Sequence, residues 1–290
     1  MKKRGWLWAA AVAAALLAGV LGWTLTHPAE GSEGLLYRVS GGQGEMYLLG
    51  SIHVGTEDMY PFGEAITQAM AQADTFVYEC DTASQEAVAA ITARMALPEG
   101  ETLRGRIGDD LYAELTQVCQ TLTLSQDTLD ALKPWAVINT LAVYATAAEL
   151  GTANVNEALS LGVEKQVQAY ARRNGKTAAY LETAVEQTDV LENFSDALKS
   201  YLLKTELDTI LDPQSASGMD ASIASWPGWW RAGNADAFAD QYMNSYLAPG
   251  YEDVCAEYHL RLVTERNARM AERLETMLAD GNSYFVTVGL

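Results

Sequence analysis

Short apolar segments near both ends of the sequence enclose a long helical middle, and this arrangement limits the fold more than any other feature. Residues 46–49 and 75–78, and residues 284–289 at the other end, have the length and apolar content of buried strands. Residues 84–173 instead show amphipathic helical periodicity without a strand signal. The pattern predicts an α/β domain with a small mixed sheet core and a large helical insertion.

The boundaries of these parts follow from the same pattern. The sheet core is expected over about residues 33–83 and 251–290, and the helical insertion over about residues 84–250. A glycine-rich turn joins a first strand, residues 35–39, to the strand that follows it, as in a β-hairpin. A brief apolar strand over residues 177–181 is predicted inside the insertion.

The N-terminal segment, residues 1–32, has the features of an export signal followed by a short linker. Three positive charges at residues 2–4 precede an uncharged apolar run over residues 5–26. As a helix, such a run reaches about 30 Å, which is enough to cross a membrane. The following residues match a cleavage site poorly, so we expect a single membrane span with the body outside the cytoplasm. Secretion after cleavage is the alternative.

Charge and cysteine usage narrow the classes of partner. The formal net charge of −19 argues against nucleic acid, which binds basic surfaces. The three cysteines are widely spaced and form no Cys-x-x-Cys pair of the kind found in zinc or redox sites. They are expected as buried apolar residues, and one disulfide stays open as an alternative.

Two side chains suited to chemistry follow two of the predicted strands. His53 comes shortly after a strand and after Gly50, and Glu79 directly follows the next strand. Parallel strands would bring both residues to the carboxyl edge of the sheet, where α/β proteins place their sites. There, an imidazole and a carboxylate can bind a divalent metal or transfer protons. A histidine with a purely structural hydrogen bond is the competing interpretation.

Two further candidates come from later in the chain. Glu182 follows the predicted strand at residues 177–181 and would share the same edge if that strand joins the sheet, although helix capping explains its position equally well. Arg266, next to Asn267, lies in a helix expected over about residues 252–278. Its guanidinium is suited to orient Glu79 or a substrate carboxylate through two parallel hydrogen bonds. A salt bridge without a role in the site is the alternative.

Several motifs together resemble the TraB/GumN family, which includes the Tiki proteases. The matching stretches occur in one order along about residues 35–290: 48–54, 60–61, 73–79, 132–135, 161–164, 175–176, 180–183, 265–271 and 284–289. The resemblance implies an α/β core with a helical insertion and two Gly-x-x-His motifs. In Tiki proteins these motifs belong to a peptidase that depends on a divalent metal, usually manganese or cobalt, and bacterial relatives are linked to silencing of peptide pheromones.

Carried over position by position, the resemblance assigns roles to individual residues. The first motif is Gly50 to His53, with His53 and Glu79 as metal ligands and Arg266 as the third catalytic residue. Asn267 pairs with the arginine as a supporting residue, and Glu182 and Gly50 support the site as well.

The second motif is incomplete in this sequence. Gly289 matches its first glycine, but the histidine expected two positions beyond Leu290 is absent. We expect a sequence truncated inside the motif, because a chain rarely ends within an apolar strand.

The leading hypothesis is an extracytoplasmic, membrane-anchored, metal-dependent peptidase that acts on peptides or on N-terminal segments of proteins. The hypothesis makes the chain inactive as written unless the second motif exists beyond residue 290. The alternative is a non-catalytic protein that binds and sequesters a pheromone-like peptide, with the aromatic cluster at residues 226–230 as its surface. A structural helper of an envelope assembly is a third expectation.

Overall fold

The computed structural model describes residues 31–152, 154–212, 223–246 and 250–290. Nearly all of the predicted signal or anchor segment, residues 1–32, therefore lies outside the described residues. Within the described part, no helix combines the length and the apolar character needed to cross a membrane.

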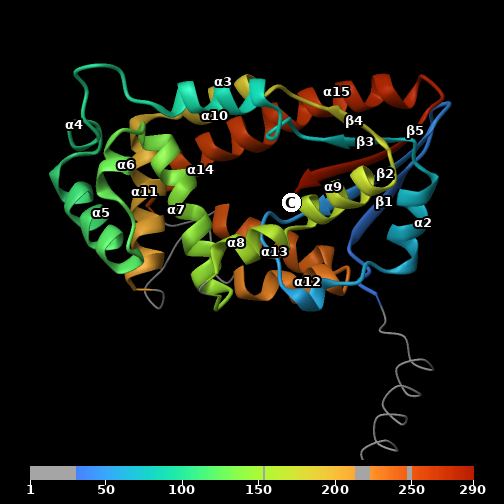
Figure 1. Cartoon of the computed structure of the whole chain (residues 1–290), viewed down its shortest axis with the longest axis horizontal. Coiled ribbons are helices and arrows are strands. Elements are labelled where there is room, and N and C mark those ends of the chain that lie inside the picture. Colours follow the sequence, from blue (N-terminus) through green and yellow to red (C-terminus); the bar gives the residue numbers. More distant parts are fainter. Residues whose placement is uncertain (1–30, 153, 213–222, 247–249) are drawn as a thin grey trace, which may run out of the picture.

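A five-stranded mixed sheet forms the core, as the sequence predicts (Figure 1). Its strands, in spatial order, are β1 (Leu35–Val39), β2 (Glu45–Ser51), β5 (Ser283–Gly289), β3 (Thr75–Tyr78) and β4 (Thr177–Tyr180). β1 pairs with β2 as an antiparallel hairpin, and all other neighbours are parallel. Because β5 is covered on both faces, Phe285 and Val286 are fully buried, which explains its continuous apolar sequence.

β5 lies between β2 and β3, the two strands that precede and follow α2 (Glu64–Gln72) in the sequence. β2 and β3 are parallel, as predicted, but each pairs with β5 and neither pairs with the other. The register sets Ser51 opposite Gly289 at the carboxyl edge, and the Leu290 amide donates to the Ser51 carbonyl at 3.1 Å. The start of the second motif therefore runs beside the first.

Helices cover the two faces of the sheet unequally (Figure 1). On one face, the apolar core includes side chains from α2, α9 (Val163–Arg173) and α12 (Trp226–Arg231). On the other face, α15 (Arg266–Leu278) packs on the sheet through residues such as Met270. Successive side chains of a strand point to opposite faces, so neighbouring residues of one strand enter different cores. Tyr78 thus faces α9 while Val77 belongs to the α15 core.

The remaining helices form most of the elongated body beside the sheet. They are α3 (Gln85–Met95), α4 (Leu103–Ile107), α5 (Asp109–Leu122), α6 (Gln126–Asp130), α7 (Pro134–Glu149), α8 (Val155–Ser160), α10 (Ala184–Glu192), α11 (Asp196–Leu211) and α13 (Ala235–Tyr246), with short 3-10 turns η1 (Glu57–Met59) and η2 (Ile223–Ser225). A second apolar core joins α5, α7 and α11, with Leu115, Leu141 and Leu207 fully buried. Within the expected insertion, residues 84–250, α9 packs on the sheet and β4 belongs to it.

The last long helix differs from the prediction. Residues 252–278 were expected to form one regular helix, but the structure has α14 (Glu252–Tyr258), a π-helical segment η3 (His259–Glu265) and then α15. Hydrophobic periodicity does not reveal a π segment, because a locally wider turn leaves the apolar pattern on either side intact. The segment sets the rotation at which Arg266 begins α15.

Candidate functional site

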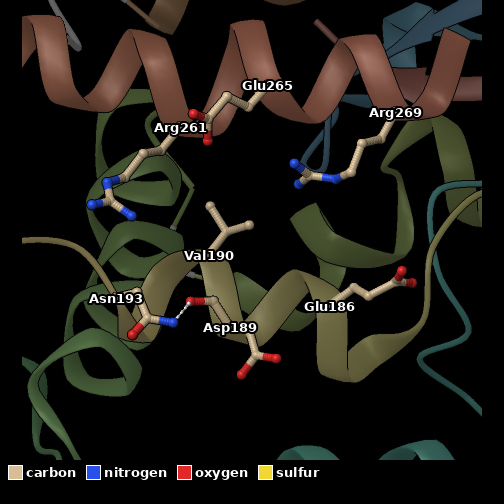
Figure 2. Close-up of a pocket in the computed structure, with 7 residues that line it drawn as sticks. All are labelled: Glu186, Asp189, Val190, Asn193, Arg261, Glu265 and Arg269. Atoms are coloured by element: carbon tan, nitrogen blue, oxygen red, sulfur yellow. Dashed lines mark hydrogen bonds between the residues drawn. The ribbon is translucent and has the colours of Figure 1, made fainter.

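Polar side chains gather where the parallel strands end. His53 follows β2, Glu79 follows β3, and Glu182 follows β4 after one intervening residue. The strand before Glu182, which was expected inside the helical insertion, joins the sheet as β4, so the condition for placing Glu182 at this edge is met. On the outer side of this region, α10 and the η3–α15 helix enclose a groove (Figure 2).

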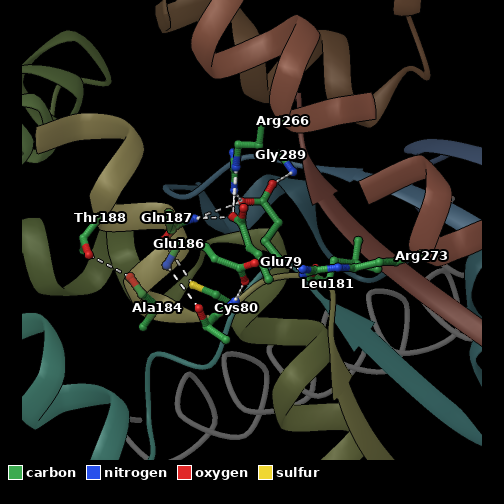
Figure 3. A network of polar contacts seen from close by, with 12 residues as sticks. Glu79, Cys80, Leu181, Ala184, Glu186, Gln187, Thr188, Arg266, Arg273 and Gly289 are labelled. Atoms are coloured by element: carbon green, nitrogen blue, oxygen red, sulfur yellow. Dashed lines mark hydrogen bonds and ion pairs between the residues drawn. The ribbon is translucent and has the colours of Figure 1, made fainter. Parts of the chain in front are cut away.

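A buried network at this edge centres on Arg266 (Figure 3). Glu79 and Glu182 are both buried, and the Arg266 guanidinium forms ion pairs with both carboxylates. The Arg266 Nε also donates to Glu182 Oε1 at 2.9 Å. The Gly289 amide donates to Glu79 Oε1 at 2.7 Å. The arginine from the last helix thus joins the ends of two strands, and β5 adds a backbone donor from between the strands.

Gln187 of α10 also belongs to this network, and the sequence interpretation missed it. Its amide donates to Glu182 at 3.2 Å and to Glu79 at 3.4 Å, and its oxygen accepts from the Cys80 thiol at 3.1 Å. The available signal was the sequence Thr-x-x-Glu at Thr183, a capping box that fixes the start of α10 at Ala184, three residues before Gln187. Nothing in that motif shows which strand ends the helix faces.

The capping box also decides between the two roles considered for Glu182. The Thr183 side chain accepts from the Glu186 amide, and the Glu186 carboxylate accepts from the Thr183 amide. Since Thr183 is the N-cap, Glu182 does not serve as the cap and its carboxylate pairs with Arg266. The Glu182 amide in turn donates to the Glu79 carbonyl at 2.8 Å, which holds the two strand ends together.

Burial and charge shift the pKa values of this network in physically consistent directions. Burial alone would raise the pKa of Glu79, but the Arg266 charge and the Gly289 hydrogen bond outweigh it and lower that pKa. The same pairing raises the pKa of Arg266 against the opposing effect of burial. Burial, together with the nearby Glu182 and Glu79 charges, raises the pKa of Cys80 to about 12. At neutral pH the network therefore holds an ionised Glu79, a charged Arg266 guanidinium and a protonated Cys80 thiol.

His53 is exposed and lies beside the buried network without a hydrogen bond to it. Its loop is held against α9, because the Val163 amide donates to the Ile52 carbonyl at 3.0 Å. At Gly162 a side chain would meet the His53 carbonyl at 2.2 Å, so only glycine permits this approach. Within the described residues, His53 makes no hydrogen bond or ion pair. It acts on Glu79 through charge, since it is among the groups that lower the Glu79 pKa.

The other supporting residues lie in different surroundings. Gly50 is packed, because a Cβ there would lie 2.4 Å from the Leu290 side chain, and its carbonyl accepts from Trp230 Nε1 at 2.7 Å. Trp230 is therefore part of the core, and the partly buried Trp226 packs against the same core. Asn267 is exposed on α15 and makes no hydrogen bond within the described part of the chain. Glu164, in the first turn of α9, has a pKa raised mainly by burial.

The described residues do not fit a metal centre built by the protein alone. Among residues 31–290, apart from the undescribed stretches, no three His, Cys, Asp or Glu side chains are grouped so that they could hold a metal ion. Both Glu79 oxygens already accept hydrogen bonds, and the neighbouring guanidinium opposes a second cation. His53 is then the remaining free ligand of the predicted pair, whereas protein metal sites usually provide three.

Comparison with known proteins places the chain in a family. The sequence model of the TraB/PrgY/gumN family matches residues 35–290. The chain belongs to this family. The resemblance noted in the sequence is thereby confirmed, and the match spans the whole sheet and the Arg266 network.

The individual relatives share low sequence identity with this chain. The chain is 24% identical over 155 residues to "Uncharacterized protein YbaP" of Escherichia coli (strain K12), and equally so to the protein of the same name from Shigella flexneri. Each alignment covers 53% of this chain and 54% of the relative, so the chain spans about half the length of the curated relatives it matches. No solved structure matches the chain.

Proposed function

We propose that this protein is a peptide-directed hydrolase whose reaction site is the carboxyl edge of the sheet, around His53. The proposal includes the membrane anchor at residues 1–32 and a position of the body outside the cytoplasm. Its substrates are peptides or N-terminal segments of proteins. Family membership supports the proposal only at the level of ancestry, because the names of the relatives state no activity.

One observation carries the proposal. An exposed imidazole stands beside a buried charge network at the ends of parallel strands, where α/β folds place their chemistry. The Arg266 pairs fix Glu79 and Glu182 in place, so their charges need no reorganisation when a new charge develops nearby. Arg266 is a positioning residue in this arrangement, because it is buried between the two carboxylates.

The chain's own residues can supply the proton transfers of amide hydrolysis. A water oxygen forms the bond to the substrate carbonyl carbon, and one ring nitrogen of His53 accepts the proton that the water loses. When the C–N bond breaks, the imidazolium returns that proton to the leaving amine nitrogen.

The manganese or cobalt expected from the resemblance is a separate part of the proposal. Imidazole and carboxylate are suitable ligands for such metals, but the described residues do not complete a centre. Calorimetric titration of the metal-free protein with Mn²⁺ or Co²⁺ tests this part directly. Tight uptake that is lost in His53→Ala supports a metal at this edge, and no uptake rejects it.

Peptide turnover tests the central proposal. The purified chain is incubated with a defined peptide mixture, and cleavage is followed by mass spectrometry with and without added Mn²⁺. His53→Gln should reduce cleavage about 10²–10⁴-fold, the range for removal of a general acid–base group. His259→Gln is the matched control, because His259 lies in η3 and contacts Tyr242 away from the sheet edge. Equal cleavage by the His53 variant and the parent would reject the proposed role.

A second candidate function is peptide binding without cleavage. It is favoured by the engagement of both Glu79 oxygens by Arg266 and Gly289, which leaves the predicted metal pair incomplete. In that case the chain should bind peptides at equilibrium while mass spectrometry detects no new products, and His53→Gln should leave binding unchanged.

A further inference from the structure

The groove between α10 and the η3–α15 helix is a cavity of about 250 Å³. Its lining contains five charged residues, one amide and one apolar side chain: Glu186, Asp189, Val190, Asn193, Arg261, Glu265 and Arg269 (Figure 2). The groove lies beside the Arg266 network, because Gln187 follows Glu186 on α10 and Arg266 follows Glu265 on the opposite wall.

Most of the lining charges already have partners outside the groove. The ion pairs are Glu186 with Arg273 at 2.8 Å, Arg261 with Glu257 at 3.2 Å, and Asp189 with Arg94. Glu265 and Arg269 are different, since neither forms an ion pair with any described residue. The order of these two residues on the helix, with glutamate four positions before arginine, is the favourable one for a pair. The structure nevertheless keeps them apart.

The two unpaired side chains point in different directions (Figure 2). The Glu265 carboxylate turns toward Arg261, whereas the Arg269 guanidinium extends below its helix into the groove and toward α10. The five N–H donors of Arg269 are thus available to a ligand in a geometry that matches a carboxylate. Glu265 ends η3, and π-helical segments are rare and occur often at functional sites.

We propose that this groove binds the C-terminal carboxylate of a peptide through Arg269. That the ligand is a peptide rests on the proposed function, whereas the binding of a carboxylate is argued from the side chains that line the groove. Glu265 adds an unpaired negative charge to the lining, whereas the carboxylates of Glu186 and Asp189 are engaged by Arg273 and Arg94. The Glu265 charge disfavours phosphate or any other polyanion, while a single carboxylate can be held by the Arg269 guanidinium. Val190 provides an apolar contact for the last side chain of the peptide.

The position of the groove gives this contact a role at the sheet edge. The Gln187 side chain extends from α10 toward Glu79 and Glu182, and Gln187 is the next residue after Glu186 of the groove wall. In this proposal the peptide continues from Arg269 along the groove wall toward the Arg266 network. Arg269 would thereby select peptides with a free C-terminus and set how far from that end the chain meets His53.

Fluorescence anisotropy tests the proposal on the full chain in detergent. The probes are a short alanine-rich peptide with an N-terminal fluorescein and a free C-terminus, the same peptide with a C-terminal amide, and the amide with one internal aspartate. The free acid should bind at least ~10-fold more tightly than the amide, the difference expected for a charge-assisted hydrogen bond. Arg269→Gln should abolish this preference, and Arg269→Lys should retain part of it.

The matched control is Arg173→Gln, which removes an exposed arginine of α9 that has no described ion pair and should keep the preference. Equal affinity for acid and amide, or a preference unchanged in Arg269→Gln, would overturn the proposal. An internal aspartate that fully replaces the free terminus would overturn it as well. Mass spectrometry of the same mixtures separates the two proposals. If the peptides stay intact while the free acid still binds more tightly than the amide, the hydrolase proposal is rejected and the groove proposal stands.

Discussion

Two glutamate–arginine pairs connect the region of α10 to α15, and they differ mainly in burial. In the Glu182–Arg266 pair the side chains are 5% and 11% exposed, whereas in the Glu186–Arg273 pair both are 42% exposed. The first pair lies at the sheet edge and shares its arginine with Glu79, while the second lies in solvent beside the groove. The two ion pairs therefore have the same chemical groups but lie in surroundings of very different dielectric constant.

This difference separates what each pair contributes. Breaking a buried pair leaves an uncompensated charge away from water, which typically costs about 3–5 kcal/mol. An exposed pair is screened by solvent and is worth about 0–1 kcal/mol. The comparison implies that the Arg266 network is built into the fold, while Arg269 and Glu265, which form no ion pair with any described residue, can respond to a ligand in the groove.

The largest effect is expected from Arg266→Met. The substitution leaves Glu79 and Glu182 buried next to each other without a cation, so the free energy of unfolding should fall by about 3–5 kcal/mol. Urea denaturation followed by circular dichroism measures the change. Arg266→Lys keeps the charge but loses the planar fork, and its loss should be smaller. A loss below about 1 kcal/mol in Arg266→Met would contradict the assigned burial of the network.

Glycine positions also differ in how much space surrounds them, and this difference should determine the cost of replacing each glycine by alanine. In Gly162→Ala the new Cβ would lie 2.2 Å from the His53 carbonyl oxygen, a backbone atom that cannot move without shifting the loop. We expect a loss of about 1–3 kcal/mol in the same denaturation measurement. Gly228→Ala is the matched control, because no atom lies within 4 Å of its added Cβ. A loss in Gly228→Ala as large as that in Gly162→Ala would remove the contrast.

The third effect is a pH dependence that belongs to Glu79. Its folded pKa lies below the ordinary value of 4.5, so its stabilising contribution is complete above pH 4.5 and is lost as the pH falls through the folded pKa. Glu79→Gln should therefore lower stability at pH 7 and flatten the loss of stability below pH 4.5. Denaturation series at several pH values measure this difference. Parallel pH profiles for parent and variant would show that Glu79 is not paired as described.

The smallest effect is expected from Glu186→Gln. The Arg273 hydrogen bond holds the pKa of Glu186 at about 2, but solvent screens this exposed pair. Glutamine also completes a capping box, so the start of α10 should persist. The change in unfolding free energy should stay within about 1 kcal/mol, and thermal denaturation suffices to check it. A loss comparable to that of Arg266→Met would remove the distinction between the two pairs.

Much of the fold was predictable because the relevant signals are local. Apolar runs of strand length identified all five strands, and amphipathic periodicity identified the helical stretch after residue 84. The positions of His53, Glu79 and Glu182 after strands predicted a shared sheet edge, since parallel strands end on the same side. The pairing of Arg266 with Glu79 was one of the alternatives that the chemistry of the arginine side chain left open, and the structure contains it.

Other features depend on contacts between distant parts of the chain. No local pattern places β5 between β2 and β3, so the hydrogen bond from Gly289 to Glu79 was not predictable. The role of Gln187 likewise depends on how α10 faces the strand ends. The π segment before Arg266 also has no counterpart in the apolar pattern.

The sequence by itself determined the elements, their order and the residue types available at the sheet edge, because propensity and hydrophobic periodicity act over a few neighbouring residues. Only the tertiary structure decided which of those residues meet. Packing joined Glu79, Glu182 and Arg266 in one buried ion-paired network, while His53 stayed exposed beside them and Arg269 was left in the groove without an ion pair to any described residue. The physical reason is that pairing and desolvation depend on distances between residues far apart in the chain, which the packing of α10 and α15 on the sheet sets.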